Sequence, residues 1–140
     1  MDSNIRRSII LDNYNNPNNR QRHDNDDYIK TNSRNVSCID NIDVYVKIED
    51  NTIKDITYEG EACAISISSS SIISNLLKDK TLEQAKEIIN NYYNMIEEKE
   101  YNKELLEEAN VFDEIYKQPS RKMCATLIVR GIEDIINKMK

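Results

Sequence analysis

The stretch that most constrains this chain is residues 60–71, where the hydrophobic period changes from that of a strand to that of a helix. Residues 52–59 alternate between apolar and polar and end at a glycine; Cys63, a serine cluster and a helical period follow. This order predicts a strand, a turn, a thiol and a helix start, with Ser66 or Ser68 as the cap of the helix. A thiol beside a helix N-terminus is close to a partial positive charge, which favours the thiolate over the thiol. Cys63 is therefore a candidate for thiolate chemistry.

A second alternating segment, residues 43–49, precedes the first, and a turn at residues 50–51 joins them. The two segments predict a β-hairpin. Cys38 and Asp40 lie just before its first strand, and Cys63 lies just after its second. Because the two strands are antiparallel, these positions meet at one end of the hairpin. We therefore expect the three side chains to lie within reach of one ion.

The flanking segments predict mainly helices. Residues 15–37 are polar and predict a long, mobile loop. Residues 97–108 are strongly acidic and predict a solvated helix or helical loop. Pro119 opens a last helix that is expected to run to the C-terminus, which places Cys124 close to its N-terminus. The other predicted helices begin near residues 4, 66 and 81.

Composition narrows the class of protein. A chain of 140 residues with only two glycines and two prolines is expected to form one domain, residues 1–140, that is rich in helix. With the hairpin, the predicted class is α+β. The net charge of −6 argues against binding to nucleic acid. There is no apolar run of about 20 residues to span a membrane and no apolar signal segment at the start, so we expect a cytoplasmic protein.

The three cysteines cannot all pair with one another, so free thiols or metal ligands are expected. Cys38, Asp40, Cys63 and Cys124 together form a set of three sulfurs and one oxygen, which suits tetrahedral zinc. The residues alone leave open whether these cysteines bind a metal or are buried packing residues. His23, the one histidine, lies in the polar loop and is expected at the surface rather than among the ligands.

Four segments carry a resemblance to a known family: residues 9–17, 38–40, 60–66 and 121–127. In order, spacing and neighbours, they resemble the U-type iron–sulfur assembly proteins, the SufU/IscU family. The resemblance implies the U-type scaffold fold, in which a small antiparallel sheet, a hairpin with a possible third short strand, packs against several α-helices. It also implies that Cys38, Asp40, Cys63 and Cys124 are the ligands of Zn²⁺.

Two features resemble the SufU-like branch of the family. Met123 stands where IscU-type scaffolds carry a histidine, and the acidic stretch at residues 97–112 is typical of SufU-like members. The implied function is a zinc-dependent sulfurtransferase that accepts persulfide sulfur from a pyridoxal-phosphate cysteine desulfurase of the SufS type. Cys38 is the expected acceptor because it comes from the loop side, and downstream iron–sulfur assembly proteins are the expected recipients.

The alternative within the family is a scaffold on which an iron–sulfur cluster is assembled and transferred, since the same thiols suit a cluster. Some positions differ from the usual family pattern. Ile39 replaces a glycine between the first two ligands, and Ala62 replaces a glycine before Cys63. Neither difference removes a ligand.

Overall fold

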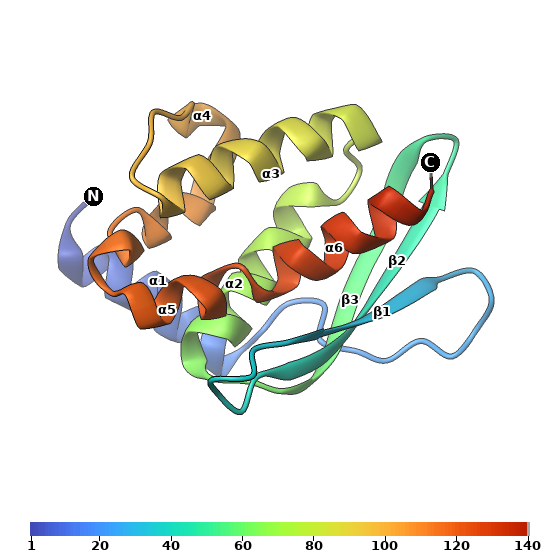
Figure 1. Ribbon diagram of the computed structural model, residues 1–140, viewed down its shortest axis with the longest axis horizontal. Coiled ribbons are helices and arrows are strands. Elements are labelled where there is room, and N and C mark those ends of the chain that lie inside the picture. The colour runs from blue at the N-terminus through green and yellow to red at the C-terminus, as the bar shows by residue number, and fades with distance from the viewer. Residues whose placement is uncertain (140) are drawn as a thin grey trace.

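Three antiparallel strands form a sheet in the order β1-β2-β3, and helices cover one of its faces (Figure 1). The computed structural model describes residues 1–139. The predicted α+β class is confirmed. The elements are α1 (Ser3–Asn15), β1 (Ile29–Arg34), β2 (Asn41–Glu49), β3 (Thr52–Glu61), α2 (Ala64–Leu77), α3 (Leu82–Ile96), α4 (Lys103–Leu106), η1 (Glu107–Phe112), η2 (Ile115–Lys117), α5 (Pro119–Ala125) and α6 (Leu127–Lys138).

The predicted hairpin is present as β2 and β3. Its turn consists of Asp50 and Asn51, whose φ angles of 51° and 60° are both positive. Asp and Asn tolerate these values better than other non-glycine residues, and two positive φ angles match the twist of a tight hairpin. The turn of the hairpin therefore lies at the two residues that the sequence indicated.

The prediction that residues 15–37 form one long loop is wrong in part, because β1 lies within them. This strand pairs with β2 from Ile29 opposite Val46 to Arg34 opposite Asn41. Its inward positions include Ser33, which is buried and donates a hydrogen bond to the Leu127 carbonyl at 2.7 Å. An edge strand that turns polar side chains to both faces shows no hydrophobic alternation. β1 is the third short strand that the fold class allowed for.

Helix α2 is buried along most of its length, including the side that carries its serines. Ser68 donates to the Ile10 carbonyl in α1 at 2.7 Å, and Ser69 donates to the Ala125 carbonyl in α5 at 2.6 Å. These small side chains let both neighbours pack closely. The prediction that Ser66 or Ser68 caps the helix is wrong: α2 begins at Ala64, so the N-cap is Cys63.

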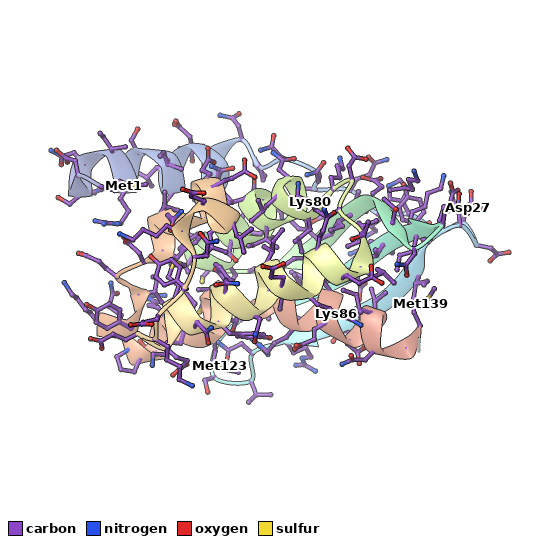
Figure 2. All side chains as sticks on the ribbon, turned by 90° about the horizontal axis from the view of Figure 1, so that it is seen from above. Met1, Asp27, Lys80, Lys86, Met123 and Met139 are labelled. Atoms are coloured by element: carbon purple, nitrogen blue, oxygen red, sulfur yellow. The ribbon has the colours of Figure 1, made fainter. Side chains whose placement is uncertain are left out.

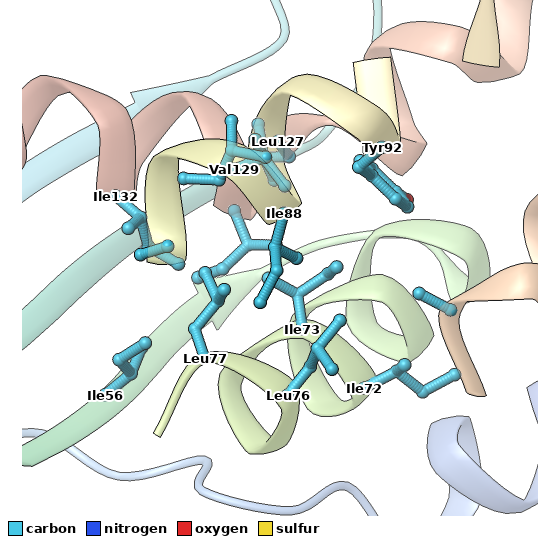
Figure 3. Close-up of a cluster of buried hydrophobic side chains, with 14 of the residues drawn as sticks. Ile56, Ile72, Ile73, Leu76, Leu77, Ile88, Tyr92, Leu127, Val129 and Ile132 are labelled. Atoms are coloured by element: carbon cyan, nitrogen blue, oxygen red, sulfur yellow. The ribbon is translucent and has the colours of Figure 1, made fainter. Parts of the chain in front are cut away.

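The hydrophobic core fills the space between the sheet and α2, α3 and α6. Figure 3 shows Leu77 of α2, Ile88 of α3 and Ile132 of α6 converging there. Helix α6 comes close to β2 at Gly131, where a Cβ would lie 2.8 Å from Val44 Cγ2. A side chain at that position would push the helix away from the sheet.

The C-terminal region differs from the prediction of one long helix. The chain breaks at Thr126, which is both the C-cap of α5 and the N-cap of α6. Cys124 therefore lies in the last turn of α5 rather than near the N-terminus of the helix that Pro119 opens. In the acidic stretch, only residues 103–106 form an α-helix and a 3-10 helix follows. The sequence carries no glycine at the break in the last helix.

Met123, beside Cys124, lies in the same half of the molecule as Met1, whereas Asp27 and Met139 lie in the other half (Figure 2). Among residues 1–139, no helix combines the length and the apolar character needed to cross a membrane.

Candidate metal centre

Four side chains from three separate segments meet at one end of the sheet. Cys38 and Asp40 lie between β1 and β2, Cys63 follows β3, and Cys124 belongs to α5. Their ligand atoms all lie within 4.8 Å of one another. In Figure 1 the β1–β2 loop, the start of α2 and α5 converge at this end. The geometric expectation from the hairpin is confirmed, and Cys124 joins the group.

Asp40 is the carboxylate of this group and is 1% exposed. It accepts hydrogen bonds from the Cys63 N–H at 2.8 Å and from the Ser66 hydroxyl at 2.5 Å. Burial raises the pKa of Asp40, but these hydrogen bonds outweigh it, so the pKa of this carboxyl lies below its ordinary value. Asp40 is therefore ionised at neutral pH.

The position of Asp40 explains the start of α2. No side chain within the helix caps it, and the Asp40 carboxylate binds the N–H of the N-cap residue, Cys63, from outside. A negative charge at a helix N-terminus is favourable because the backbone N–H groups there carry partial positive charge. The hydroxyl of Ser66, which the sequence suggested as a cap, instead fixes the other carboxylate oxygen.

The three thiols differ in exposure. Cys38 is exposed, Cys63 is half-buried and Cys124 is 1% exposed. Burial, together with the neighbouring Asp40 and Cys63, which accept hydrogen bonds and carry like charge, raises the pKa of the Cys124 thiol to about 12. A cation between these side chains would favour the Cys124 thiolate, whereas the protein alone favours the thiol.

Asn35 organises the loop that carries Cys38, and sequence reasoning missed it. It is 4% exposed, accepts the Cys38 N–H at 3.0 Å and donates its own N–H to the Asp40 carbonyl at 3.0 Å. Its side chain binds the Ser37 N–H at 3.1 Å and donates to Cys124 Sγ at 3.7 Å. An asparagine that starts a turn before two candidate ligands is the signal that indicates this role.

Arg130 of α6 was also missed. Its guanidinium donates to the Met123 carbonyl at 2.7 Å and to the Arg34 carbonyl at 3.3 Å. These bonds tie the end of β1 to α5 directly beside the thiols. Nothing in the sequence indicates the role, because an arginine on an amphipathic helix is usually a solvated residue.

His23 lies outside the candidate metal group of the described chain. Its side chain is partly buried, at 17% exposure, and stacks on Tyr28 with a ring distance of 3.9 Å. Tyr28 follows His23 closely in the chain, and both rings lie in the segment that was expected to be mobile.

The donor set fits zinc. Zn–S bonds of about 2.3 Å in a tetrahedron place neighbouring sulfurs roughly 3.8 Å apart. The four ligand atoms, within 4.8 Å of one another, need to move by only about 1 Å to reach that arrangement. Calcium and magnesium bind oxygen ligands, so a set of three sulfurs and one carboxylate oxygen suits zinc better than either of those ions.

Comparisons with known proteins confirm the expected family and the U-type fold. Residues 5–125 match the family described as the NifU-like N-terminal domain. The chain is 31% identical to the zinc-dependent sulfurtransferase SufU of Bacillus subtilis, over 94% of this chain and 89% of that protein. It is 27% identical to the iron–sulfur cluster assembly scaffold protein IscU of Thermotoga maritima, over 76% of this chain and 75% of that protein.

A solved structure is similar along most of the chain. It is that of a putative iron–sulfur cluster assembly scaffold protein for the SUF system from Fervidobacterium islandicum AW-1. The two superpose with a TM-score of 0.84 at 26% identity, over 89% of this chain and 91% of that one.

Proposed function

The chain belongs to the family of NifU-like N-terminal domains, the U-type family that includes SufU and IscU, and we propose that it is a zinc-dependent sulfur acceptor in iron–sulfur cluster assembly. It takes persulfide sulfur from a pyridoxal-phosphate cysteine desulfurase and passes it to downstream assembly proteins. The observation that carries the proposal is the exposed thiol of Cys38 beside three less accessible donors.

Cys38 performs the transfer because a partner protein can reach it. Its thiolate attacks the terminal sulfur of the partner's persulfide, and a new S–S bond forms at Cys38. The partner's own S–S bond breaks, and its cysteine leaves as a thiolate. The exchange involves no net oxidation, and both thiolates and the transferred sulfur are accounted for.

The remaining residues prepare Cys38 and hold the site. Zn²⁺ held by Cys38, Asp40, Cys63 and Cys124 would keep the thiols deprotonated at neutral pH. Cys124 is buried in α5 and Cys63 starts α2, so neither can approach a partner without disturbing a helix. Cys38 lies in a turn between two strands and can move while the other three donors stay in place.

A second candidate function is a scaffold for an iron–sulfur cluster, which would be the cargo of the protein. The similarity to proteins named as scaffolds supports it, and cysteine thiolates suit both metals. Met123 argues against it, since a thioether is a weaker ligand than an imidazole and its side chain is 46% exposed.

Metal analysis and absorption spectroscopy of the purified protein distinguish the two functions. The sulfur acceptor is expected to contain about one zinc per chain and to have no visible absorption band. A brown protein with iron and acid-labile sulfide would support the scaffold and contradict the first proposal. The Asp40→Ala variant serves as the control for site-specific metal, because it removes one donor and is expected to lower the metal content in either case.

A further inference from the structure

A groove of about 510 Å³ opens on the outer face of the sheet, beside Cys38. The helices cover the opposite face of the sheet, and the groove reaches the metal centre at Cys38 and Asp40, which both line it. Its lining includes Cys38, Arg34 at the end of β1, Asn41 at the start of β2 and Glu61 at the end of β3. The candidate acceptor thiol therefore forms part of the wall of a cavity large enough for a small molecule.

Arg34, Asn41 and Glu61 form one row across the sheet. Arg34 lies opposite Asn41 in the first strand pair, and Asn41 lies opposite Glu61 in the second. Directly paired residues point to the same face of a sheet. Because neighbouring strands are about 4.8 Å apart, the α-carbons of Arg34 and Glu61 lie roughly 10 Å apart. A cation and an anion thus stand on either side of a neutral amide.

Of the other carboxylates that line the groove, Asp40 accepts hydrogen bonds from the Cys63 N–H and the Ser66 hydroxyl, and the remaining two are in ion pairs. Asp43 pairs with Arg22 at 3.1 Å, and Glu59 pairs with Arg20 at 2.8 Å. By contrast, within the described residues the side chains of Arg34 and Glu61 take part in no ion pair. The two charges that flank the thiol are therefore available to a ligand.

We propose that this groove binds a small thiol carrying both an α-carboxylate and an α-ammonium group, with free cysteine as the simplest case. The carboxylate pairs with Arg34 and the ammonium pairs with Glu61, which directs the ligand's thiol toward Cys38. The proposal rests on the function proposed above, because it gives the sulfur held by Cys38 a second exit. The chain then delivers sulfur to a small molecule as well as to proteins.

The step balances without an oxidant. The thiolate of the bound small molecule attacks the outer sulfur of the Cys38 persulfide. The S–S bond at Cys38 breaks and Cys38 leaves as a thiolate, while a persulfide forms on the small molecule. The number of S–S bonds is unchanged, and no electrons enter or leave the pair.

The test follows the unloading of Cys38. The protein is loaded with inorganic polysulfide, which needs no partner, and desalted; mass spectrometry then follows the peptide that carries Cys38. Four thiols are added in turn: cysteine, cysteamine, 3-mercaptopropionate and 2-mercaptoethanol. The variants are Arg34→Gln and Glu61→Gln. The controls are Arg7→Gln and Glu100→Gln, which change exposed residues outside the groove.

The ratio of variant to wild-type rate is compared for each thiol, since intrinsic thiol reactivity cancels in this ratio. Arg34→Gln is expected to slow unloading by cysteine and 3-mercaptopropionate about two- to fivefold, the factor expected for one exposed ion pair. Glu61→Gln is expected to slow unloading by cysteine and cysteamine by a similar factor. Neither variant changes unloading by 2-mercaptoethanol, and the controls change nothing.

Equal ratios for all four thiols would overturn the proposal. So would an Arg34→Gln variant that slows only loading by a desulfurase, because Arg34 would then serve a protein partner. If wild-type Cys38 acquires no sulfur from a desulfurase, the proposed function fails instead. The polysulfide-loaded protein still reports on the groove in that case, so the two failures are distinguishable.

Discussion

The hydroxyl of Ser66 donates a 2.5 Å hydrogen bond to the Asp40 carboxylate, which joins the first turn of α2 to the β1–β2 loop. Both residues are buried, at 0% and 1% exposure. Ser66→Ala leaves one oxygen of a buried charge without this donor. We expect the variant to lose about 1–3 kcal/mol of unfolding free energy in urea titrations.

Ser70→Ala is the matched control for Ser66→Ala. Its hydroxyl is equally buried but donates to the Ser66 carbonyl within the same helix, at 2.8 Å. This helical carbonyl has a backbone partner as well, so a smaller loss is expected. Equal losses in the two variants would contradict the role assigned to the bond between Ser66 and Asp40.

The backbone requires a glycine at position 60, just before the candidate ligand Cys63. Its φ is +148°, and a Cβ at this position would lie 2.2 Å from the Asn41 carbonyl oxygen. Gly60→Ala is therefore expected to cost about 1–3 kcal/mol from backbone strain alone, with further loss from the clash. Calorimetry measures the change, with Lys54→Ala, an exposed position of the same strand, as the control. A Gly60→Ala protein as stable as the control would show that β3 can shift freely there.

Asp55 in β3, away from the metal centre, makes the stability of the protein depend on pH. Burial raises the pKa of Asp55, but the Tyr28 hydroxyl at 2.5 Å and the Lys78 ammonium at 3.1 Å lower it below its ordinary value. The stability from Asp55 is therefore fully present above about pH 5 and is lost as the pH falls through the folded-state pKa. Lys78 is the cation that pairs with this carboxyl, and His23 Nε2 lies 4.0 Å from its Oδ2.

Asp55→Asn removes this titration. We expect urea midpoints of the variant to be lower than wild type near neutral pH and to depend less on pH between about pH 5 and pH 2. Asp26→Asn, a change at an exposed residue of the loop that carries Tyr28, should keep the wild-type slope. An unchanged slope in Asp55→Asn would assign the acid sensitivity to other carboxylates.

The sequence predicted the hairpin, most of the helices and the four members of the candidate metal centre. The hairpin was predictable because alternation in residues 43–49 and 52–59 is local and its turn has strong conformational preferences. The clustering of Cys38, Asp40 and Cys63 followed from strand direction alone. Cys124 required the family resemblance, since no local pattern relates α5 to the hairpin.

What the sequence did not predict depends on contacts between distant segments. β1 has a polar composition, so only its pairing with β2 identifies it as a strand. The break at Thr126 has no glycine or proline to indicate it. Asn35 and Ser66 act through hydrogen bonds to Asp40 whose geometry exists only in the folded chain. Their roles therefore came from the structure.

The central claim is that Cys38 receives the sulfur, and the most direct measurement locates it. The protein is incubated with a cysteine desulfurase and cysteine, desalted, and analysed by mass spectrometry of the cysteine-containing peptides. We predict one added sulfur on Cys38, and stimulation of desulfurase turnover that disappears in Cys38→Ser. Sulfur found on Cys63 or Cys124 instead, or full stimulation by Cys38→Ser, would contradict the account.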